Sequence, residues 1–203
     1  MLRVGLTGGL VSGKSFIGRA LEELGCYVIR ADDLGHQVLL PGAEAYQPVV
    51  AEFGSSILDE NGTIDRRRLA ALVFHDPEKL AKLSSIVHPA VTRLQEQETA
   101  RIKAANPNAI VVVEAAILVE TGSYVKFDRL IVAVCTPEQQ LERAMKRDSY
   151  SLEDAMERIS RQLPLEEKKR VAHFVIDTSG NKENTLEQTR VVYEALRQAA
   201  GGQ

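Results

Sequence analysis

The sequence predicts an α/β fold with a five-stranded parallel sheet and a phosphate-binding loop after the first strand. Two observations lead to this fold class. Short apolar runs that fit strands alternate with amphipathic helical patterns, which is the order typical of parallel sheets. Residues 8–15 read Gly-Gly-Leu-Val-Ser-Gly-Lys-Ser and match the spacing G-x-x-x-x-G-K-[ST] between a strand and a helix. The 203 residues suffice for one such core with helical insertions.

Each residue type in the loop suits the binding of phosphate. Glycine lets the backbone turn its N–H groups toward an anion, because no Cβ stands in the way. Lys14 can reach the β- and γ-phosphates, and the Ser15 hydroxyl can ligate Mg²⁺. The following helix directs its N-terminal N–H groups to the same place. We therefore expect a nucleoside triphosphate to bind at Gly8, Gly9, Val11, Ser12, Gly13, Lys14, Ser15 and Phe16.

The remaining elements follow in the order that a parallel sheet requires. Strands are predicted at residues 3–6, 27–29, 109–113, 129–134 and 172–177. The third of these runs is continuously apolar, which fits a buried central strand. Helices are predicted from the loop to Gly25 and at residues 136–147, 151–162 and 185–199.

Residues 41–108 are predominantly helical in pattern and are inserted between two strands, so we expect a substrate-binding subdomain that covers the sheet. Proline removes a helical hydrogen bond, and a break is therefore expected at His88-Pro89, between helices at 76–87 and 91–103. The charge run of three arginines at 66–68 also fits a solvated helix face. The apolar pattern around His88 also fits a histidine that is buried in the core and has no role in catalysis.

Two acids, Asp32 and Asp33, follow the second strand. In an open parallel sheet, ligands bind outside the carboxyl ends of the strands. A carboxylate there could take a proton from an acceptor hydroxyl or hold Mg²⁺ through water. The alternative is an N-cap for the next helix. Spacing alone favours neither reading.

Four arginines occupy two short helices after the fourth strand. Arg143 and Arg147 are four residues apart, and Arg158 and Arg161 are three apart, so each pair shares a helix face. They could close over phosphates as a lid. The alternative is ion pairing with the neighbouring acids Glu142, Glu153, Asp154 and Glu157.

Composition excludes several classes of function. The net charge of −3 gives no support to general nucleic-acid binding. No apolar run approaches the ~20 residues that a membrane span needs, and no signal peptide is recognisable. We expect a cytoplasmic protein whose two cysteines, Cys26 and Cys135, are buried thiols.

Further motifs resemble one family. They are Ala31-Asp32-x-Leu34 with His36, Asp65-Arg66-x-x-Leu69, Ile86-Val87-His88-Pro89, Gln140-x-x-Arg143, Arg158-Ile159-x-x-Gln162 and Val175-Ile176-Asp177. In this order, and along nearly the whole chain, they resemble the dephospho-coenzyme A kinase family. The loop is generic to a large superclass, whereas the Asp-Arg-x-x-Leu and Ile-x-His-Pro elements are much more specific.

The resemblance implies transfer of the ATP γ-phosphate to the ribose 3′-hydroxyl of dephospho-coenzyme A, with Mg²⁺, as the last step of coenzyme A synthesis. It implies a three-layer α/β/α fold of the P-loop NTPase class. The nucleotide-binding core would comprise residues 1–40, 109–142 and 165–203, the acceptor subdomain residues 41–108, and the lid residues 143–164. ATP and dephospho-coenzyme A are the expected partners of a monomer or small homo-oligomer.

The resemblance also implies a role for individual residues. Asp32 would be the general base, and Lys14 the second catalytic residue. Ser15 would hold the metal, and Arg143 and Arg147 would steady ATP. The acceptor would contact Thr7, Asp32, His36, Arg66 and His88, and the lid would carry Arg158 and Arg161.

The chain departs from the family pattern at Val11, Arg30 and Thr178, among other positions. Val11 stands where the family usually has glycine, and valine is costly in unusual regions of φ/ψ space. Thr178 stands where the family tends to have asparagine, so the adenine contact is expected to differ in detail. Because Gly13, Lys14, Ser15 and Asp32 remain, we expect an active enzyme.

Two other functions compete with this interpretation. A nucleoside monophosphate or shikimate kinase would share the loop, lid and sheet, but would not need the motifs of residues 65–89. A GTP-binding switch would use Asp59-x-x-Gly62 and a guanine motif near Asn181-Lys182-Glu183-Asn184. The fourth position of that motif is asparagine, so the carboxylate that would recognise guanine is missing.

Overall fold

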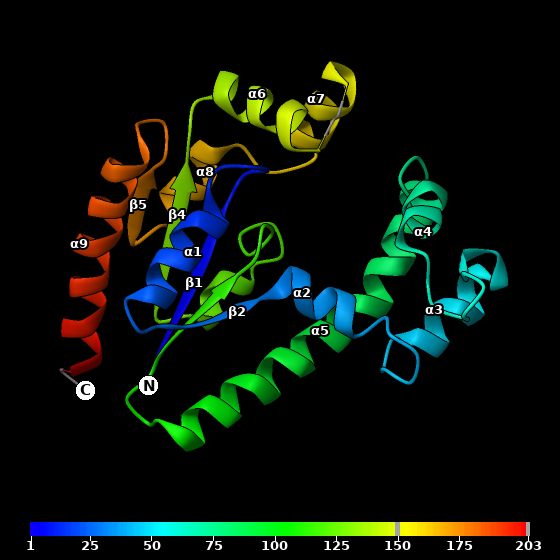
Figure 1. Ribbon diagram of the computed structural model, residues 1–203, viewed down its shortest axis with the longest axis horizontal. Coiled ribbons are helices and arrows are strands. Elements are labelled where there is room, and N and C mark those ends of the chain that lie inside the picture. Colours follow the sequence, from blue (N-terminus) through cyan, green and yellow to red (C-terminus); the bar gives the residue numbers. More distant parts are fainter. Residues whose placement is uncertain (149–150, 202–203) are drawn as a thin grey trace. The chain divides into compact units, whose positions relative to one another are not determined.

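The computed structural model describes residues 1–148 and 151–201 (Figure 1). The strands are β1 (Leu2–Gly8), β2 (Tyr27–Arg30), β3 (Ile110–Glu114), β4 (Arg129–Val134) and β5 (Phe174–Asp177). The helices of the first half are α1 (Lys14–Glu23), α2 (Ala31–Gln37), α3 (Tyr46–Phe53), the 3₁₀ turn η1 (Ser55–Ile57), α4 (Arg66–Val73) and α5 (Pro77–Ala105). The helices of the second half are η2 (Ser123–Lys126), α6 (Pro137–Asp148), α7 (Leu152–Ser160), α8 (Leu165–Arg170) and α9 (Lys182–Gly201).

The five strands form one sheet in the order β2-β3-β1-β4-β5. β1 lies at its centre and pairs in parallel with β3, where Leu2 is opposite Ile110, and with β4, where Val4 is opposite Arg129. β3 is buried along its whole length, as its continuous apolar run predicts. The predicted α/β fold with a parallel sheet is confirmed. Because the strands are parallel, the loops after β1, β3 and β4 meet at one edge of the sheet.

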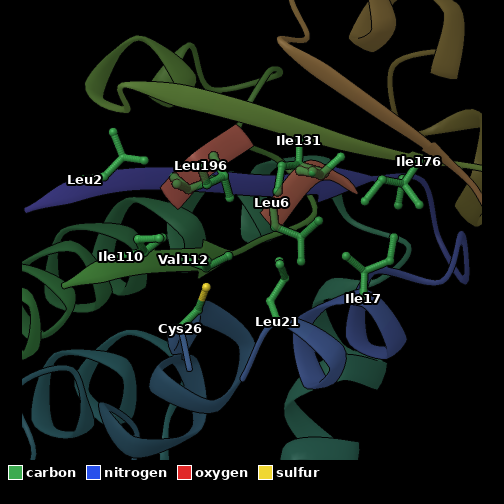
Figure 2. Close-up of a cluster of buried hydrophobic side chains, with 13 residues drawn as sticks. Leu2, Leu6, Ile17, Leu21, Cys26, Ile110, Val112, Ile131, Ile176 and Leu196 are labelled. Carbon is green, nitrogen blue, oxygen red and sulfur yellow. The ribbon is translucent and has the colours of Figure 1, made fainter. Parts of the chain in front are cut away.

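A layer of buried apolar side chains holds α1 and α9 against this sheet (Figure 2). Leu6 of β1 and Ile131 of β4 are fully buried, as are Ile17 of α1 and Leu196 of α9. Burying one such side chain stabilises a fold by about 1.5–3 kcal/mol. The packing anchors α1 directly after the phosphate-binding loop, so the loop is held at both of its ends.

The chain divides into two compact units, residues 1–29 with 101–203 and residues 30–100. The unit of residues 30–100 has its own small core, in which α3 and α4 supply Val49, Leu69 and Val73. Asp65 caps α4, and its Oδ1 accepts hydrogen bonds from the backbone N–H groups of Arg67 and Arg68 at 2.8 and 3.2 Å. These two bonds lower the pKa of the Asp65 carboxyl.

The expected break at Pro89 is wrong, because α5 continues from Pro77 to Ala105 with Pro89 inside it. Pro89 and the preceding turn residue Ser85 are exposed, so the Ser85 carbonyl that loses its partner can bond to water. The apolar residues on both sides of the proline pack into one cluster with Val38 and Ala45. Tertiary packing therefore outweighs the local preference of proline. The sequence patterns also did not predict α2, α3 and α8 as separate helices.

Both cysteines are buried and free, as predicted. Burial raises the pKa of the Cys26 thiol to about 12, and burial also raises the pKa of Cys135. Within residues 1–148 and 151–201, no helix combines the length and the apolar character that a bilayer crossing demands.

Candidate active site

The phosphate-binding loop, residues 8–15, leads from the carboxyl end of β1 into α1. Gly13 has a φ of 90° and Val11 a φ of 49°, both in the left-handed region. A Cβ on Gly13 would come within 2.8 Å of Thr178 Cγ2, so this position requires glycine for space as well as for conformation. Val11 adopts the left-handed region although its side chain is β-branched, which is costly for the backbone. The valine that stands where the family usually has glycine therefore strains the loop.

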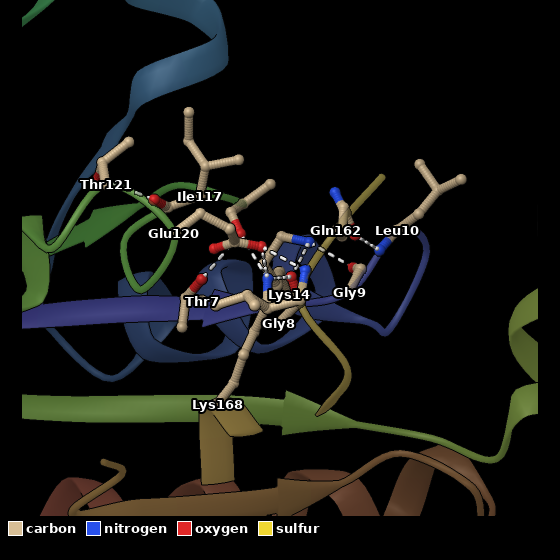
Figure 3. A network of polar contacts seen from close by, with 12 residues as sticks. Thr7, Gly8, Gly9, Leu10, Lys14, Ile117, Glu120, Thr121, Gln162 and Lys168 are labelled. Carbon is tan, nitrogen blue, oxygen red and sulfur yellow. Dashed lines mark hydrogen bonds and ion pairs between the residues drawn. The ribbon is translucent and has the colours of Figure 1, made fainter. Parts of the chain in front are cut away.

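Lys14 and Ser15 begin α1, and their side chains contact different partners. Lys14 Nζ donates to the Gly9 carbonyl at 2.7 Å and lies 3.4 Å from the Gly8 carbonyl (Figure 3). Ser15 Oγ donates to Glu114 Oε1 at 2.6 Å. Glu114 is buried at the carboxyl end of β3, beside the strand that carries the loop. No role for Glu114 was predicted from the sequence, although an acid directly after a buried central strand indicates a position at the ligand-binding edge of the sheet.

Ser15 and Glu114 form a suitable pair for a divalent cation. Both offer hard oxygen atoms, and Mg²⁺ is held by one or two such protein ligands with substrate phosphates and water. Gly18 leaves room for this carboxylate, because a Cβ there would come within 2.9 Å of Glu114 Oε2. The described parts of the chain contain no cluster of three or more His, Cys, Asp or Glu suited to a metal. A cation here would therefore depend on the nucleotide for further ligands.

Arg143 is connected to the loop through Thr178. The arginine donates from Nη1 to Thr178 Oγ1 at 3.0 Å and from Nη2 to the Thr178 carbonyl at 2.7 Å. Thr178 Oγ1 in turn lies 3.0 Å from the Ser12 carbonyl and 3.1 Å from that of Val134. Its single proton can go to only one of them. Thr178, which departs from the family pattern, thus still links Arg143 to the loop by polar contacts. Arg147, one turn further along α6, is exposed.

A second lysine, Lys168 of α8, lies beside the loop and is fully buried. Its Nζ forms an ion pair with Glu120 Oε1 at 2.6 Å and lies 3.3 Å from the Gly8 carbonyl. Gln162, which follows α7, accepts a hydrogen bond from the Leu10 N–H at 2.7 Å. Figure 3 shows these side chains converging on the loop. Sequence reasoning missed Lys168, because it stands in the charged run Glu-Glu-Lys-Lys-Arg that resembles a solvated helix face.

Three further candidate residues, Thr7, Arg158 and Arg161, lie in this unit. Thr7 is fully buried and donates from Oγ1 to the Ala116 carbonyl at 3.1 Å. Arg161 forms the expected alternative ion pair with Glu157, at 2.5 Å. Arg158 is half-buried on the same helix, α7.

The remaining candidates lie in the unit of residues 30–100. Asp32 and Asp33 occupy the first turn of α2, whose N-cap is Arg30, so the N-cap alternative is wrong. Asp32 and His36 share one helix face and are exposed.

The two candidates further along this unit are exposed as well. Arg66 is the first residue of α4. His88 lies within α5, and the alternative of a buried core histidine is wrong.

The two motifs that suggested a GTP-binding switch serve local structure instead. Asp59 Oδ1 accepts hydrogen bonds from the N–H groups of Asn61 and Thr63 at 2.9 and 2.8 Å, which closes its own turn. Asn181 Oδ1 accepts from the Asn184 N–H at 2.8 Å at the start of α9. These contacts give the motif residues a structural role.

Comparisons with known proteins identify one family. A family model for dephospho-CoA kinase matches residues 2–184. A dephospho-CoA kinase from Aquifex aeolicus (strain VF5) is 44% identical over 196 residues, which cover 97% of this chain and 98% of that protein. A dephospho-CoA kinase from Carboxydothermus hydrogenoformans is 41% identical over 193 residues, with 94% of this chain and 92% of that protein covered.

Solved structures agree with this result. A crystal structure from Thermus thermophilus has a TM-score of 0.80 at 31% identity, covering 96% of this chain and 97% of that one. Dephospho-CoA kinase from Campylobacter jejuni has a TM-score of 0.64 at 26% identity, with 96% of both chains covered. Shikimate kinase from Bacteroides thetaiotaomicron, at 12% identity and a TM-score of 0.52 over 96% of this chain and 98% of that one, is similar in fold alone.

Proposed function

We propose the reaction of this chain from its family: the chain belongs to the dephospho-CoA kinase family. It catalyses the ATP-dependent phosphorylation of dephospho-CoA, the final step of CoA synthesis. The ribose 3′-hydroxyl oxygen attacks the γ-phosphorus of ATP, the bond to the β-phosphate oxygen breaks, and ADP leaves. The products are CoA and ADP.

The observation that carries the ATP half of the reaction is the loop with its two anchored side chains. Lys14 lies against the loop carbonyls, with Nζ 2.7 Å from the Gly9 oxygen, and can turn to the β- and γ-phosphates. Phosphoryl transfer depends chiefly on positioning and charge stabilisation, which a preorganised ammonium supplies. Arg143 adds a second cation near the loop, because Thr178 bonds both to Arg143 and to the Ser12 carbonyl of the loop.

We propose Mg²⁺ as the metal that accompanies ATP. Ser15 Oγ and Glu114 Oε1, which are 2.6 Å apart, would hold it directly or through water. When bound, it neutralises charge on the phosphates. Glu114 also fixes the orientation of the Ser15 hydroxyl.

Asp32 is proposed as the general base. α2 begins directly after β2, so chain connectivity puts Asp32 two residues beyond the end of a sheet strand. An exposed carboxylate can accept the proton of a secondary hydroxyl as the bond to phosphorus forms. We propose that Thr7, His36, Arg66 and His88 belong to the acceptor side, with residues 41–108 as the acceptor subdomain and residues 1–40, 109–142 and 165–203 as the core.

We also propose that residues 143–164 form a lid, in which Arg158 and Arg161 approach bound nucleotide. For Arg161 this requires exchange of its partner Glu157 for phosphate. Amide hydrogen exchange in residues 151–162 should slow when an ATP analogue binds. Unchanged exchange at saturation would show that this helix is static.

The acceptor is tested by turnover of the purified chain with ATP and Mg²⁺. ADP release is expected with dephospho-CoA, and the product should carry its new phosphate on the 3′-oxygen, as phosphorus NMR can determine. Shikimate and AMP serve as competing acceptors. Comparable ADP release with either of them would contradict the proposed acceptor. We further propose that the chain acts in the cytoplasm as a monomer or small homo-oligomer.

A further inference from the structure

Lys168 is unusual among the lysines of α8 because its side chain is fully buried. Its neighbour Lys169 has a side chain 37% exposed and pairs with Glu166 at 2.9 Å, one turn earlier on the same helix. Lysine is almost never fully buried unless it is paired. The burial of Lys168 therefore calls for an explanation that Lys169 does not need.

All three protons of the Lys168 ammonium have an acceptor. Nζ lies 2.6 Å from Glu120 Oε1, 2.9 Å from the Ala116 carbonyl and 3.3 Å from the Gly8 carbonyl. Glu120 and Ala116 belong to the segment after β3, and Gly8 begins the phosphate-binding loop. One buried cation thus joins three segments that are distant in sequence.

The same stretch of chain contacts the loop at a second point. Gln162 Oε1 accepts from the Leu10 N–H at 2.7 Å, and the Leu163 N–H donates to Glu120 Oε1 at 3.2 Å. Residues 162–168 therefore hold the loop at the Gly8 carbonyl and at the Leu10 amide (Figure 3). This stretch begins two residues after the end of α7.

Stability alone does not account for this arrangement. Replacing a buried ion pair by well-packed apolar side chains is often neutral or stabilising. The contacts of Lys168 and Gln162 instead lie on the backbone of the element that binds phosphate. The Gly8 carbonyl that Lys168 contacts also lies 3.4 Å from Nζ of Lys14.

We infer that Lys168, with Gln162, is a positioning residue for the phosphate-binding loop, and that it ties the conformation of this loop to the segment after α7. Resting on the proposed function, the inference assigns Lys168 to the ATP side of the reaction. The Lys168 ammonium fixes the Gly8 carbonyl, and this aligns the loop N–H groups and Lys14 with the phosphates. Its loss should weaken ATP binding and turnover and leave acceptor binding unchanged.

The test removes the ion pair as a unit. Lys168→Met alone leaves the Glu120 carboxylate buried without its cation, which is strongly destabilising. The double variant Lys168→Met/Glu120→Gln keeps the side-chain volumes and removes both charges. Its melting temperature should recover to within a few degrees of the parent. Its affinity for a non-hydrolysable ATP analogue with Mg²⁺, measured by calorimetry, should fall about 10-fold, the scale of losing an orienting contact.

Steady-state kinetics of the same double variant separate the two substrates. We expect a higher KM for ATP and a lower kcat. The KM for dephospho-CoA should stay within about twofold of the parent, because the variant removes no contact to the acceptor. The exposed pair gives a matched control: Lys169→Met/Glu166→Gln should change neither the melting temperature nor the analogue affinity.

A second variant, Gln162→Leu, breaks the other contact without altering buried charge, and should weaken analogue binding about threefold, as expected for one hydrogen bond. The inference is overturned if the double variant, or Gln162→Leu when the double variant does not fold, binds the analogue as the parent does. A purely structural Lys168 would give that result. If analogue binding falls but dephospho-CoA is not a substrate even for the parent, the positioning role stands and the proposed function fails.

Discussion

The two units of the chain present their candidate residues in different ways. In the unit of residues 1–29 and 101–203, site side chains are fixed by contacts: Lys14 on the loop carbonyls, Ser15 on Glu114 and Arg143 on Thr178. In the unit of residues 30–100, the candidate side chains project from helix surfaces and are exposed, and they are Asp32, His36, Arg66 and His88.

This difference fits the two tasks proposed for the units, which are stabilising the transferred phosphoryl group and binding the acceptor. Stabilising charge on a transferring phosphoryl group requires groups that are in place before the reaction, so that no reorganisation is needed. Binding an acceptor can use exposed side chains that acquire their final geometry with the substrate, since catalytic hydrogen bonds are often loose before it binds. Substitutions in the first unit should therefore disturb geometry, whereas those in the second should remove single contacts.

The largest effect is expected from Lys14→Ala. It removes the charge that we propose meets the phosphates, and kcat should fall by at least ~100-fold, the scale of losing one preorganised contact in the transition state. The melting temperature should barely change, because this side chain is only partly buried. A folded variant with near-normal kcat would contradict the assignment of Lys14.

Asp32→Asn tests the second unit with a change that keeps shape and removes the proton acceptor. We expect kcat to fall roughly 100-fold, within the range for loss of a general base, with little change in ATP affinity. Asp33→Asn, one position along the exposed first turn of α2, is the matched control and should be mild. If Asp33→Asn abolishes turnover and Asp32→Asn does not, the base is the other carboxylate.

Two glycines sharpen the comparison between the units. A Cβ on Gly18 would come 2.9 Å from Glu114 Oε2, whereas a Cβ on Gly35 in α2 would meet nothing within 4 Å. Gly18→Ala should displace Glu114 and raise the Mg²⁺ concentration for half-maximal activity roughly 10-fold, as loss of an orienting contact does. Gly35→Ala should stabilise its helix by about 0.5–1 kcal/mol. Mg²⁺ titration and thermal unfolding measure the two effects, and equal behaviour of both variants would refute the contrast.

The smallest effect is expected from Val11→Gly. Left-handed backbone costs a residue with a Cβ about 1–2 kcal/mol, and Val11 has a φ of 49°. Glycine removes this strain but adds about 0.5–1 kcal/mol of backbone entropy to the unfolded chain. The free energy of unfolding should therefore rise by less than ~1 kcal/mol, as denaturant titration can measure. A loss of stability would mean that the Val11 side chain contributes packing that outweighs its strain.

Much of the fold was predictable because it depends on local patterns. β4 matches its predicted bounds, and α7 begins after Ser151, close to the predicted start at residue 151, with the Ser151 hydroxyl accepting a hydrogen bond from the Asp154 N–H at 3.1 Å. Pro89 was misjudged because the local cost of proline is offset by the apolar cluster around it. His88 was expected at this break, but it lies within α5, and its exposure depends on which face of α5 is buried.

The sequence alone determined the phosphate-binding loop, the alternating elements of the sheet and the family to which the chain belongs. A glycine loop followed by Lys14 and Ser15 carries its chemistry within eight residues, so spacing was enough to identify it. Only the tertiary structure showed that Glu114 holds Ser15 and that Lys168 holds Gly8. These partners are 99 and 160 residues apart in sequence, and the parallel sheet brings them together through long crossovers that leave no local pattern.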